Sequence, residues 1–435
     1  MQQENYDAVI IGAGIIGSCI AFEMAKRGWR TLNIDKFPAA GYGSTSYSCA
    51  IIRTHYSTLT GTAMAYEGYH RWRQWREYLG VNDERGLAEF RQSGCLVLKT
   101  RGNAGLGPVL GHTQVLGIPW EEWDEAQILK RLPFLNLDCF APPRQPEDAD
   151  FGVPTGGRIQ GGVYFPIAGY INDPQLAAHN AQVAAEHRGA RFRFSSEVVA
   201  IDSRNNRVDG VTLNSGEKIL APVVVNVGGP YSSVLNRLAG VDEKMVLTTR
   251  ALRQEVAHVT FMPEFDFEHD GTIYSDNDVG CYARPDVGNR LLVGSENPEC
   301  DPMEWVDPDR MNESLTEQAN AQLMRMAQRI PDLPIPGHLS GIAACYDVTP
   351  DWIPVYDKSD LDGYYLAIGT SGNQFKNAPV VGELMAELIS ACENGADQDR
   401  SPMPFRLEAL GRTIDSGFFS RNWEVNAESS FSVLG

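Results

Sequence analysis

The glycine-rich sequence GAGIIG at residues 12–17 constrains the fold of this chain more than any other feature. It directly follows DAVII at 7–11, an apolar run that suits a buried parallel strand. Residues 18–27 place apolar side chains at helical spacing, and 30–34 form a second apolar run that ends at Asp35. The chain is therefore predicted to open with a β-α-β unit of about 30 residues.

The glycine spacing in this unit is that of the Rossmann dinucleotide fingerprint. Gly12 permits a tight turn, Gly14 lets the backbone approach a pyrophosphate, and Gly17 allows the helix to pack closely on the sheet. The positive end of the helix dipole favours phosphate, and Asp35 can accept hydrogen bonds from both ribose hydroxyls. The motif predicts a dinucleotide cofactor but does not separate FAD from NAD.

Charge and composition exclude several classes of protein. The chain has 435 residues, of which 56 are acidic and 37 are basic, a net charge of −19, and 43% are apolar. This apolar content excludes a disordered chain, and the negative charge argues against nucleic acid or an anionic membrane surface as a partner. The scattered cysteines and histidines lack metal-ligand spacing. Residues 1–7 show no secretory signal and the apolar stretch 8–22 is too short to span a bilayer, so we expect a cytoplasmic protein.

The rest of the chain alternates predicted helices and strands. Helices are expected at 62–79, 174–188, 309–330 and 379–391, strands at 191–194, 198–202, 208–213, 218–220, 223–227 and 363–369, further strands within 250–300, and irregular structure at 104–117 and 139–162. For the aromatic-rich stretch 66–79 we prefer a helix with its aromatic face buried to an exposed stacking surface. The pattern predicts an α/β (α+β) fold, with a nucleotide-binding domain built from separated segments and an inserted, mostly antiparallel sheet domain.

The C-terminal third carries a second motif. Gly369-Thr-Ser-Gly-Asn-Gln-Phe-Lys376 follows a predicted strand and precedes a helix with Gly382-Glu383. This segment resembles the flavin-binding segment of the D-amino-acid oxidase and sarcosine oxidase family of FAD enzymes, including its sarcosine oxidase beta-subunit-like members. A helix N-terminus there would stabilise negative charge on a reduced flavin. TSYSCAIIR at 45–53, ACYDVTPD at 344–351 and CYARP at 281–285 also resemble family segments.

This resemblance covers nearly the whole chain and implies non-covalent FAD. It implies the following division: 1–90, 161–240 and 341–435 in the FAD-binding domain, and 91–160 and 241–340 in the substrate domain. The implied cofactor-binding residues are Gly12, Ala13, Gly14, Ile15, Ile16, Gly17, Asp35, Lys36, Gly43, Ser44, Thr45, Ser46, Cys49, Val198, Gly228, Gly229, Gly369, Ser371, Gly372, Asn373, Gln374, Phe375 and Lys376.

Four residues are implied to serve catalysis. Arg53 and Lys376 match the positions that bind the substrate carboxylate in the sarcosine oxidase branch, and two such cations would orient the substrate. Tyr282 matches an active-site tyrosine, although a tyrosine of the core is an equal alternative. Glu296 falls where the branch has a histidine near the substrate amine, so it either pairs with a cationic amine or is an exposed loop acid.

The reaction implied is oxidation of a small amino acid or N-methylated amine carboxylate by hydride transfer to the flavin, giving an imine that hydrolyses. Leu292 stands where the branch has a lysine credited with activating oxygen, which leaves open both O2 and another electron acceptor. Ala344 stands where some members have the cysteine that bonds the flavin, and Cys345 is one residue further along the strand. The alternatives are a 2-hydroxy-acid dehydrogenase and a flavin-bearing subunit of a homo- or hetero-oligomeric complex.

Overall fold

The first of two large sheets is formed by segments from the whole length of the chain. The computed structural model describes residues 5–103 and 106–433; residues 1–4, part of the segment expected to lack a signal, lie outside the described residues. The sheet has six strands in the order β19-β20-β13-β1-β2-β9, all parallel except β19. Their bounds are β1 Ala8–Ile11, β2 Thr31–Ile34, β9 Arg191–Arg193, β13 Val224–Asn226, β19 Val355–Lys358 and β20 Tyr364–Ile368. Strand β1 lies between β13 and β2, so the sheet continues on both of its sides. The carboxyl end of such a strand is the switch point at which ligands bind in parallel α/β sheets.

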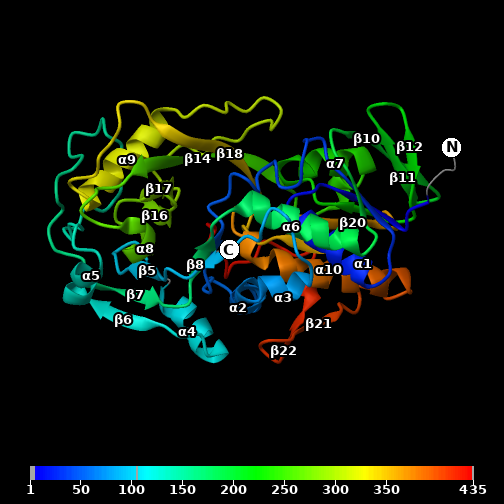
Figure 1. The fold of residues 1–435 in the computed structure, drawn as a ribbon, viewed down its shortest axis with the longest axis horizontal. Helices are drawn as coiled ribbons and strands as arrows, with labels where there is room; N and C mark the ends of the chain where they lie inside the picture. Colours follow the sequence, from blue (N-terminus) through cyan, green and yellow to red (C-terminus); the bar gives the residue numbers. More distant parts are fainter. Residues whose placement is uncertain (1–4, 104–105, 434–435) are drawn as a thin grey trace.

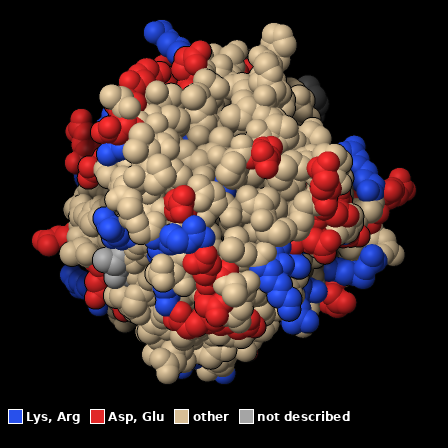
Figure 2. Space-filling model, turned by 90° about the vertical axis from the view of Figure 1, so that its left-hand side faces the viewer, with Lys and Arg blue, Asp and Glu red and all other residues tan. Residues whose placement is uncertain are grey.

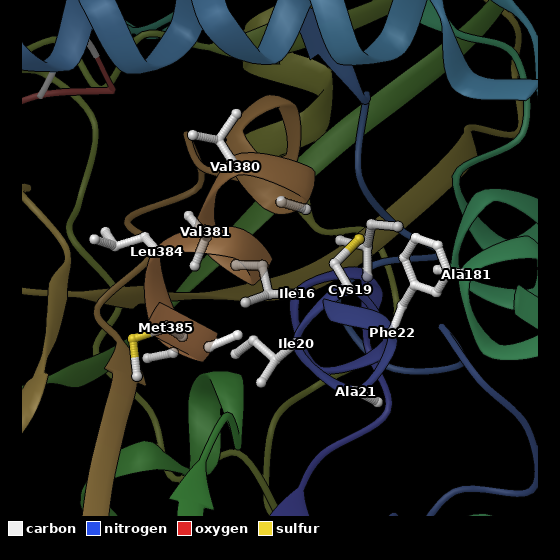
Figure 3. Close-up of a cluster of buried hydrophobic side chains, with 14 of the residues drawn as sticks. Ile16, Cys19, Ile20, Ala21, Phe22, Ala181, Val380, Val381, Leu384 and Met385 are labelled. Carbon is white, nitrogen blue, oxygen red and sulfur yellow. The ribbon is translucent and has the colours of Figure 1, made fainter. Parts of the chain in front are cut away.

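Three helices cover one face of this sheet: α1 Ile15–Lys26, α6 Pro174–His187 and α10 Ala378–Glu393. Side chains alternate along β1, so Ala8 and Ile10 pack toward these helices. Figure 3 shows α1 and α10 in contact through Ile16, Ile20, Val381 and other apolar side chains. A Cβ on Gly382 would lie 2.7 Å from the Cys19 carbonyl oxygen, so this glycine allows the two helices to approach closely.

The opposite face of the first sheet packs on a three-stranded antiparallel sheet and a short helix. These elements are β10 Val198–Arg204, β11 Arg207–Leu213, β12 Lys218–Leu220 and α7 Ser232–Ala239. Val9 and Ile11, the alternate residues of β1, lie in this second core. Both faces of β1 are therefore buried, which explains its continuous apolar sequence.

The second large sheet is mostly antiparallel, as predicted, and lies beside the first (Figure 1). Its eight strands have the order β18-β14-β17-β16-β15-β5-β7-β6, and only β5 and β15 pair in parallel. The bounds are β5 Cys95–Leu98, β6 Glu121–Asp124, β7 Gly161–Phe165, β14 Arg250–Thr260, β15 Ile273–Asp276, β16 Cys281–Asp286, β17 Arg290–Ser295 and β18 Ser340–Val348. Two segments predicted to belong to the FAD-binding domain, β7 and β18, are thus strands of this sheet, because their backbones pair with β5, β6 and β14.

Helices cover the outer face of the second sheet: α5 Glu125–Arg131, α8 Phe267–Asp270 and α9 Glu317–Arg329. The other face, which carries Cys95, Val97 and Ile273, turns toward a large cavity between the two sheets. Figure 2 shows the surface at this end of the molecule, where acidic and basic side chains lie interspersed around a broad uncharged area.

Several predicted bounds are wrong. Residues 106–116, predicted to be irregular, form α4 Leu106–Leu116, because Pro108 falls in the first turn, where proline is tolerated, and Val109 and Thr113 form a buried i, i+4 pair. Helix α1 begins at Ile15, so the fingerprint itself enters the helix. Helix α9 begins only after Thr316, whose side chain caps it.

The remaining elements, apart from the long helix α2, are short. They are β3 Ile51–Ile52, α2 Leu59–Arg73, α3 Trp75–Leu79, β4 Phe90–Arg91, β8 Gly169–Ile171, η1 Gly229–Tyr231, η2 Asp242–Lys244, η3 Phe375–Asn377, β21 Pro404–Leu407, β22 Arg412–Asp415 and η4 Ser416–Phe419. The aromatic helix predicted at 62–79 is thus two helices, and its aromatic face is buried as expected, with Trp72 and Trp75 in the core. Within 5–103 and 106–433, no helix is long and apolar enough to cross a membrane.

Candidate active site

A cavity of about 1090 Å³ runs from the glycine turn after β1 to the C-terminal motif. It lies between the carboxyl ends of the parallel strands and the inner face of the antiparallel sheet. The predicted site residues that line it are Gly12, Gly14, Ile15, Ile16, Gly17, Asp35, Lys36, Gly43, Ser44, Thr45, Cys49, Arg53, Val198, Gly228, Gly229, Tyr282, Glu296, Gly372, Gln374, Phe375 and Lys376. The fold therefore brings together most of the residues that the sequence singled out.

Five predicted cofactor-binding residues do not line the cavity: Ala13, Ser46, Gly369, Ser371 and Asn373. They shape the loops behind its wall instead. The Ala13 N–H donates to Asp35, the Gly369 N–H donates to Asp347 Oδ2 at 2.7 Å, and the Ser371 hydroxyl donates to the Gly369 carbonyl. These hydrogen bonds occupy the groups that would otherwise be free for a ligand.

The glycine turn leaves no room for larger residues. Gly12 has a φ of +119°, and a Cβ there would lie 2.3 Å from the Val227 carbonyl oxygen. A Cβ on Gly17 would lie 2.3 Å from the Gly12 carbonyl oxygen. Gly14 is the N-cap residue of α1 and has no side chain to cap the helix. The first-turn residues of α1 line the cavity. This end of the cavity therefore presents a helix N-terminus to a ligand, the arrangement that binds phosphates.

Asp35 at the end of β2 has a different bonding pattern from the one predicted. Its Oδ2 accepts the Ala13 N–H at 2.7 Å and its Oδ1 accepts the Phe37 N–H at 2.9 Å. Burial raises the pKa of this carboxyl despite these two bonds. Each carboxylate oxygen keeps a second lone pair, so Asp35 both holds the glycine turn and remains at the cavity wall.

Lys36 connects the two sheets across the cavity. Its ammonium lies 2.8 Å from Asp309 Oδ1, in the loop before α9, and 3.6 Å from the centroid of the Tyr231 ring. The salt bridge brings the loop of the second sheet over the glycine-turn end of the cavity. No sequence signal connected residues 36 and 309, because their proximity depends on the packing of the two sheets.

Two cations converge at the other end of the cavity. The Arg53 guanidinium and the Lys376 ammonium lie 4.8 Å and 5.2 Å from the centroid of the Tyr56 ring. Lys376 Nζ donates to the Tyr56 hydroxyl at 2.7 Å and to the Asn373 carbonyl at 2.6 Å. Arg53 Nε and Nη2 are buried without a hydrogen-bond partner in the described part of the chain. Burial, together with Arg53, holds the pKa of Lys376 well below its usual range.

Helix α2 holds the segment that carries Lys376. The Trp72 indole N–H donates to the Lys376 carbonyl at 2.8 Å, and the Trp72 ring stacks on Phe375. A Cβ on Gly68 would lie 2.4 Å from the same carbonyl oxygen. The aromatic helix thus serves to position one cation of the site, a role that its amphipathic pattern did not indicate.

The inner face of the antiparallel sheet forms the roof of the cavity. Tyr282 lies on β16, and its hydroxyl is 3.3 Å from Cys49 Sγ. A Cβ on its cross-strand partner Gly294 would lie 2.4 Å from the Tyr282 ring, so the absence of a side chain there leaves space for the tyrosine. Tyr282 lines the cavity and is half-buried, and its role as an active-site tyrosine stays a prediction.

Glu296 also faces the cavity, directly after β17. The alternative of an exposed loop acid is wrong, because Glu296 is only partly accessible and its Oε2 is fully buried. Its Oε1 accepts the Ser275 hydroxyl at 2.5 Å.

The sequence reasoning missed two parts of the wall. Ser275 on β15 and the C-terminal residues Glu428, Ser429, Ser430, Ser432 and Val433 line the cavity. Ser275 shares a face with Ile273 by simple alternation, but only the pairing of β15 with β5 and β16 turns that face inward. The C-terminal segment is held by hydrogen bonds to Asp351, which had no visible signal in sequence.

A Rossmann-type sheet with its glycine turn at one end of a long cavity, and two basic side chains under an antiparallel sheet at the other, defines a dinucleotide-dependent oxidoreductase. The model of the family "FAD dependent oxidoreductase" matches residues 7–388. The chain belongs to this family, and its cofactor is FAD.

Several known proteins are similar to this chain over most of their length. The monomeric sarcosine oxidase of Streptomyces avermitilis is 26% identical over 402 residues, which cover 88% of this chain and 93% of that protein. The sarcosine oxidase subunit beta of Rhizobium meliloti is 25% identical, over 94% of this chain and 89% of that one. The crystal structure of L-proline dehydrogenase from P. horikoshii has the same fold, with a TM-score of 0.73 at 23% identity, over 90% of this chain and 94% of that chain.

The residues present fit FAD. Gly12, Gly14 and the first turn of α1 line the cavity, which suits a pyrophosphate at the helix N-terminus, and the cavity continues from there to Lys376. A Cβ on Gly372 would lie 2.4 Å from the Tyr346 ring, so the C-terminal motif packs closely under the roof at the far end. The binding roles of the individual lining residues remain predictions.

Proposed function

We propose that this protein oxidises a small amino acid or an N-methylated secondary or tertiary amine carboxylate. The observation that supports this proposal is the pair of basic residues at the end of the cavity away from the glycine turn, the half-buried Arg53 and the buried Lys376. Neither forms a salt bridge with an acid of the described residues. A substrate carboxylate between them would favour the charged form of Lys376 and would give the buried Nε and Nη2 of Arg53 the acceptors that they lack.

The chain's own residues fix the substrate. The bound flavin would supply hydride acceptance from the substrate carbon. Arg53 and Lys376 would hold the carboxylate through charge-assisted hydrogen bonds and so set the orientation of the carbon next to the nitrogen. Tyr282 and the apolar side chains Val97 and Ile273 of the sheet face would cover the substrate and exclude water. The imine formed would then hydrolyse in solution, and O2 or another acceptor would reoxidise the enzyme.

Anaerobic mixing tests this function. The flavin absorbance near its visible maximum is expected to bleach when the protein is mixed with the correct amine, in a panel of N-methyl amino acids, glycine, L-proline and D-amino acids. The same panel includes 2-hydroxy acids, which would bleach the flavin if the protein were a hydroxy-acid dehydrogenase. Bleaching by no amine of the panel would contradict the proposal.

Replacement of Arg53 by methionine is expected to weaken carboxylate binding by about 10- to 100-fold, because hydrogen bonds to charged groups contribute about 1.5–3 kcal/mol each. The measurement is a titration of the flavin spectrum with the active amine. Arg76→Met is the matched control, since Arg76 is exposed on α3. An unchanged apparent affinity in Arg53→Met would refute the role of Arg53.

We also propose that the FAD is held without a covalent bond. Both Ala344 and Cys345 border the cavity, but successive side chains of a strand point to opposite faces, and Cys345 Sγ contacts Met311 Sδ at 3.2 Å. Acid precipitation is therefore expected to release all yellow colour into the supernatant, for the wild type and for Cys345→Ser alike. Flavin retained in the wild-type pellet and released from the variant would contradict this expectation.

A second candidate is a flavin-bearing subunit of a hetero-oligomeric complex. The similarity to a sarcosine oxidase subunit beta, over 94% of this chain, favours it. Size-exclusion chromatography of the protein purified from its own cells would test this candidate, and turnover only in the presence of a co-purifying chain would support it.

A further inference from the structure

The roof of the cavity carries a carboxyl group, Glu296, that interacts electrostatically with Arg53. Resting on the proposed function, we propose that Glu296 binds the ammonium group of the substrate and takes up its proton. The substrate would then be an amino acid that arrives as a zwitterion, with its carboxylate on Arg53 and Lys376 and its ammonium N–H directed to Glu296. This assigns a catalytic residue and a requirement for a protonated nitrogen.

The backbone around Glu296 is fixed on both sides. Its own N–H donates to the Gly280 carbonyl at 3.0 Å. The preceding Ser295 donates its hydroxyl to Asp301 at 2.7 Å, and the following Asn297 accepts a hydrogen bond from Gln254 at 3.0 Å. The carboxyl group is therefore held in place before a ligand arrives, as a binding residue requires.

The carboxyl group itself lacks one partner. Oε1 accepts the Ser275 hydroxyl, but the buried Oε2 has no hydrogen-bond partner within the described residues. An unsatisfied buried carboxylate oxygen is costly, which indicates a donor that the chain does not supply. Of the other acids of the wall, Asp35 accepts a backbone N–H on each oxygen, whereas Asp347 accepts one on Oδ2 and its Oδ1 also lacks a partner within the described residues.

The charges around Glu296 favour proton exchange near neutral pH. The titratable groups that interact with it are Arg53, Asp276, Cys95 and Cys281. Burial raises the pKa of Glu296 to about 7, with a smaller contribution from the charge of Asp276, although the hydrogen bond from Ser275 and the charge of Arg53 act in the opposite direction. An ammonium group beside the carboxylate would lower the pKa of Glu296, because its positive charge favours the ionised carboxylate. The cations that hold the substrate carboxylate would in turn lower the pKa of that ammonium.

The proposed step balances without any redox partner. One N–H bond of the substrate ammonium breaks, one O–H bond forms on Glu296, and the electron pair of the broken bond stays on nitrogen. The product is the neutral amine, whose lone pair is available when hydride leaves the adjacent carbon. Arg53 is excluded from this step because its guanidinium stays protonated, and the proposal places Lys376 on the carboxylate.

The test compares ligands that share shape and carboxylate but differ in the amine. The pairs are glycine with propionate, N-methylglycine with methoxyacetate, and L-proline with tetrahydrofuran-2-carboxylate. In the holoenzyme, Glu296→Gln is expected to weaken binding of the amine member at least ten-fold and to change binding of the partner that lacks the amine less than two-fold. Glu299→Gln is the matched control, because Glu299 is exposed three residues further along the same loop.

A second measurement detects the proton. The rate of anaerobic flavin bleaching in the wild type is expected to fall as the pH drops below the pKa of Glu296, since a protonated carboxyl cannot accept the ammonium proton. Glu296→Gln should lose this ionisation from its pH profile, and Glu296→Asp should retain it.

The outcomes separate this inference from the proposed function. Equal weakening of both members of a pair in Glu296→Gln, or an unchanged pH profile, would overturn the role of Glu296 alone. Failure of the wild type to bind any of the six ligands would overturn the carboxylate site itself and the inference with it. Selective loss of the amine members together with the altered pH profile would establish the role.

Discussion

Gly12→Ala is expected to yield a protein that is purified without flavin and is about 2–4 kcal/mol less stable than the wild type. The backbone of Gly12 has a φ of +119°, which other residues rarely adopt, and the new Cβ would lie 2.3 Å from the Val227 carbonyl oxygen. That carbonyl belongs to the segment after β13, so the clash would force apart the two strands whose ends form the cavity. The measurements are the ratio of visible to ultraviolet absorbance and the urea unfolding midpoint.

The control for this prediction is Gly111→Ala. Gly111 lies in α4, where an added Cβ would meet no atom within 4 Å, and the variant should gain up to about 1 kcal/mol because alanine is the better helix former. A Gly12→Ala protein with the flavin content and stability of the wild type would refute the assigned role of the turn.

Arg329→Met is expected to destabilise the part of the protein built on the antiparallel sheet by about 3–5 kcal/mol, because it leaves two buried carboxylates without a counter-charge. Arg329 is fully buried on α9 and donates to Asp276 Oδ2 at 2.6 Å and to Asp278 Oδ2 at 3.1 Å. It also donates to the carbonyls of Asn136 and Asp138. The urea unfolding midpoint, followed by tryptophan fluorescence, measures the effect.

Two further variants test whether the unpaired buried charge causes the loss of stability. Arg310→Met removes an exposed salt bridge to Asp307 and should cost less than about 1 kcal/mol. Adding Asp276→Asn and Asp278→Asn to Arg329→Met should recover part of the lost stability, since the unpaired charges are then gone. A triple variant less stable than Arg329→Met would contradict this explanation.

Local sequence was sufficient to predict the structure where one short segment contains all the interacting residues. The glycine turn, the strand before it and the helix after it lie within residues 8–26, and the structure confirms their order. It was insufficient for α4, because glycine and proline composition hid a helix whose buried pair is only Val109 and Thr113. The predicted helix at 309–330 failed in the opposite way, since its first turns lie in the loop that carries Asp309.

The sequence by itself determined the β-α-β unit and the family, and through them FAD and the cations Arg53 and Lys376, because each signal resides in a contiguous motif. Only the tertiary structure decided which side chains meet around the substrate. Ser275 reaches Glu296 because β15, β16 and β17 pair in one particular register, and Lys36 reaches Asp309 because the two sheets face each other. Strand register and sheet packing depend on contacts between distant segments, and local periodicity does not encode them.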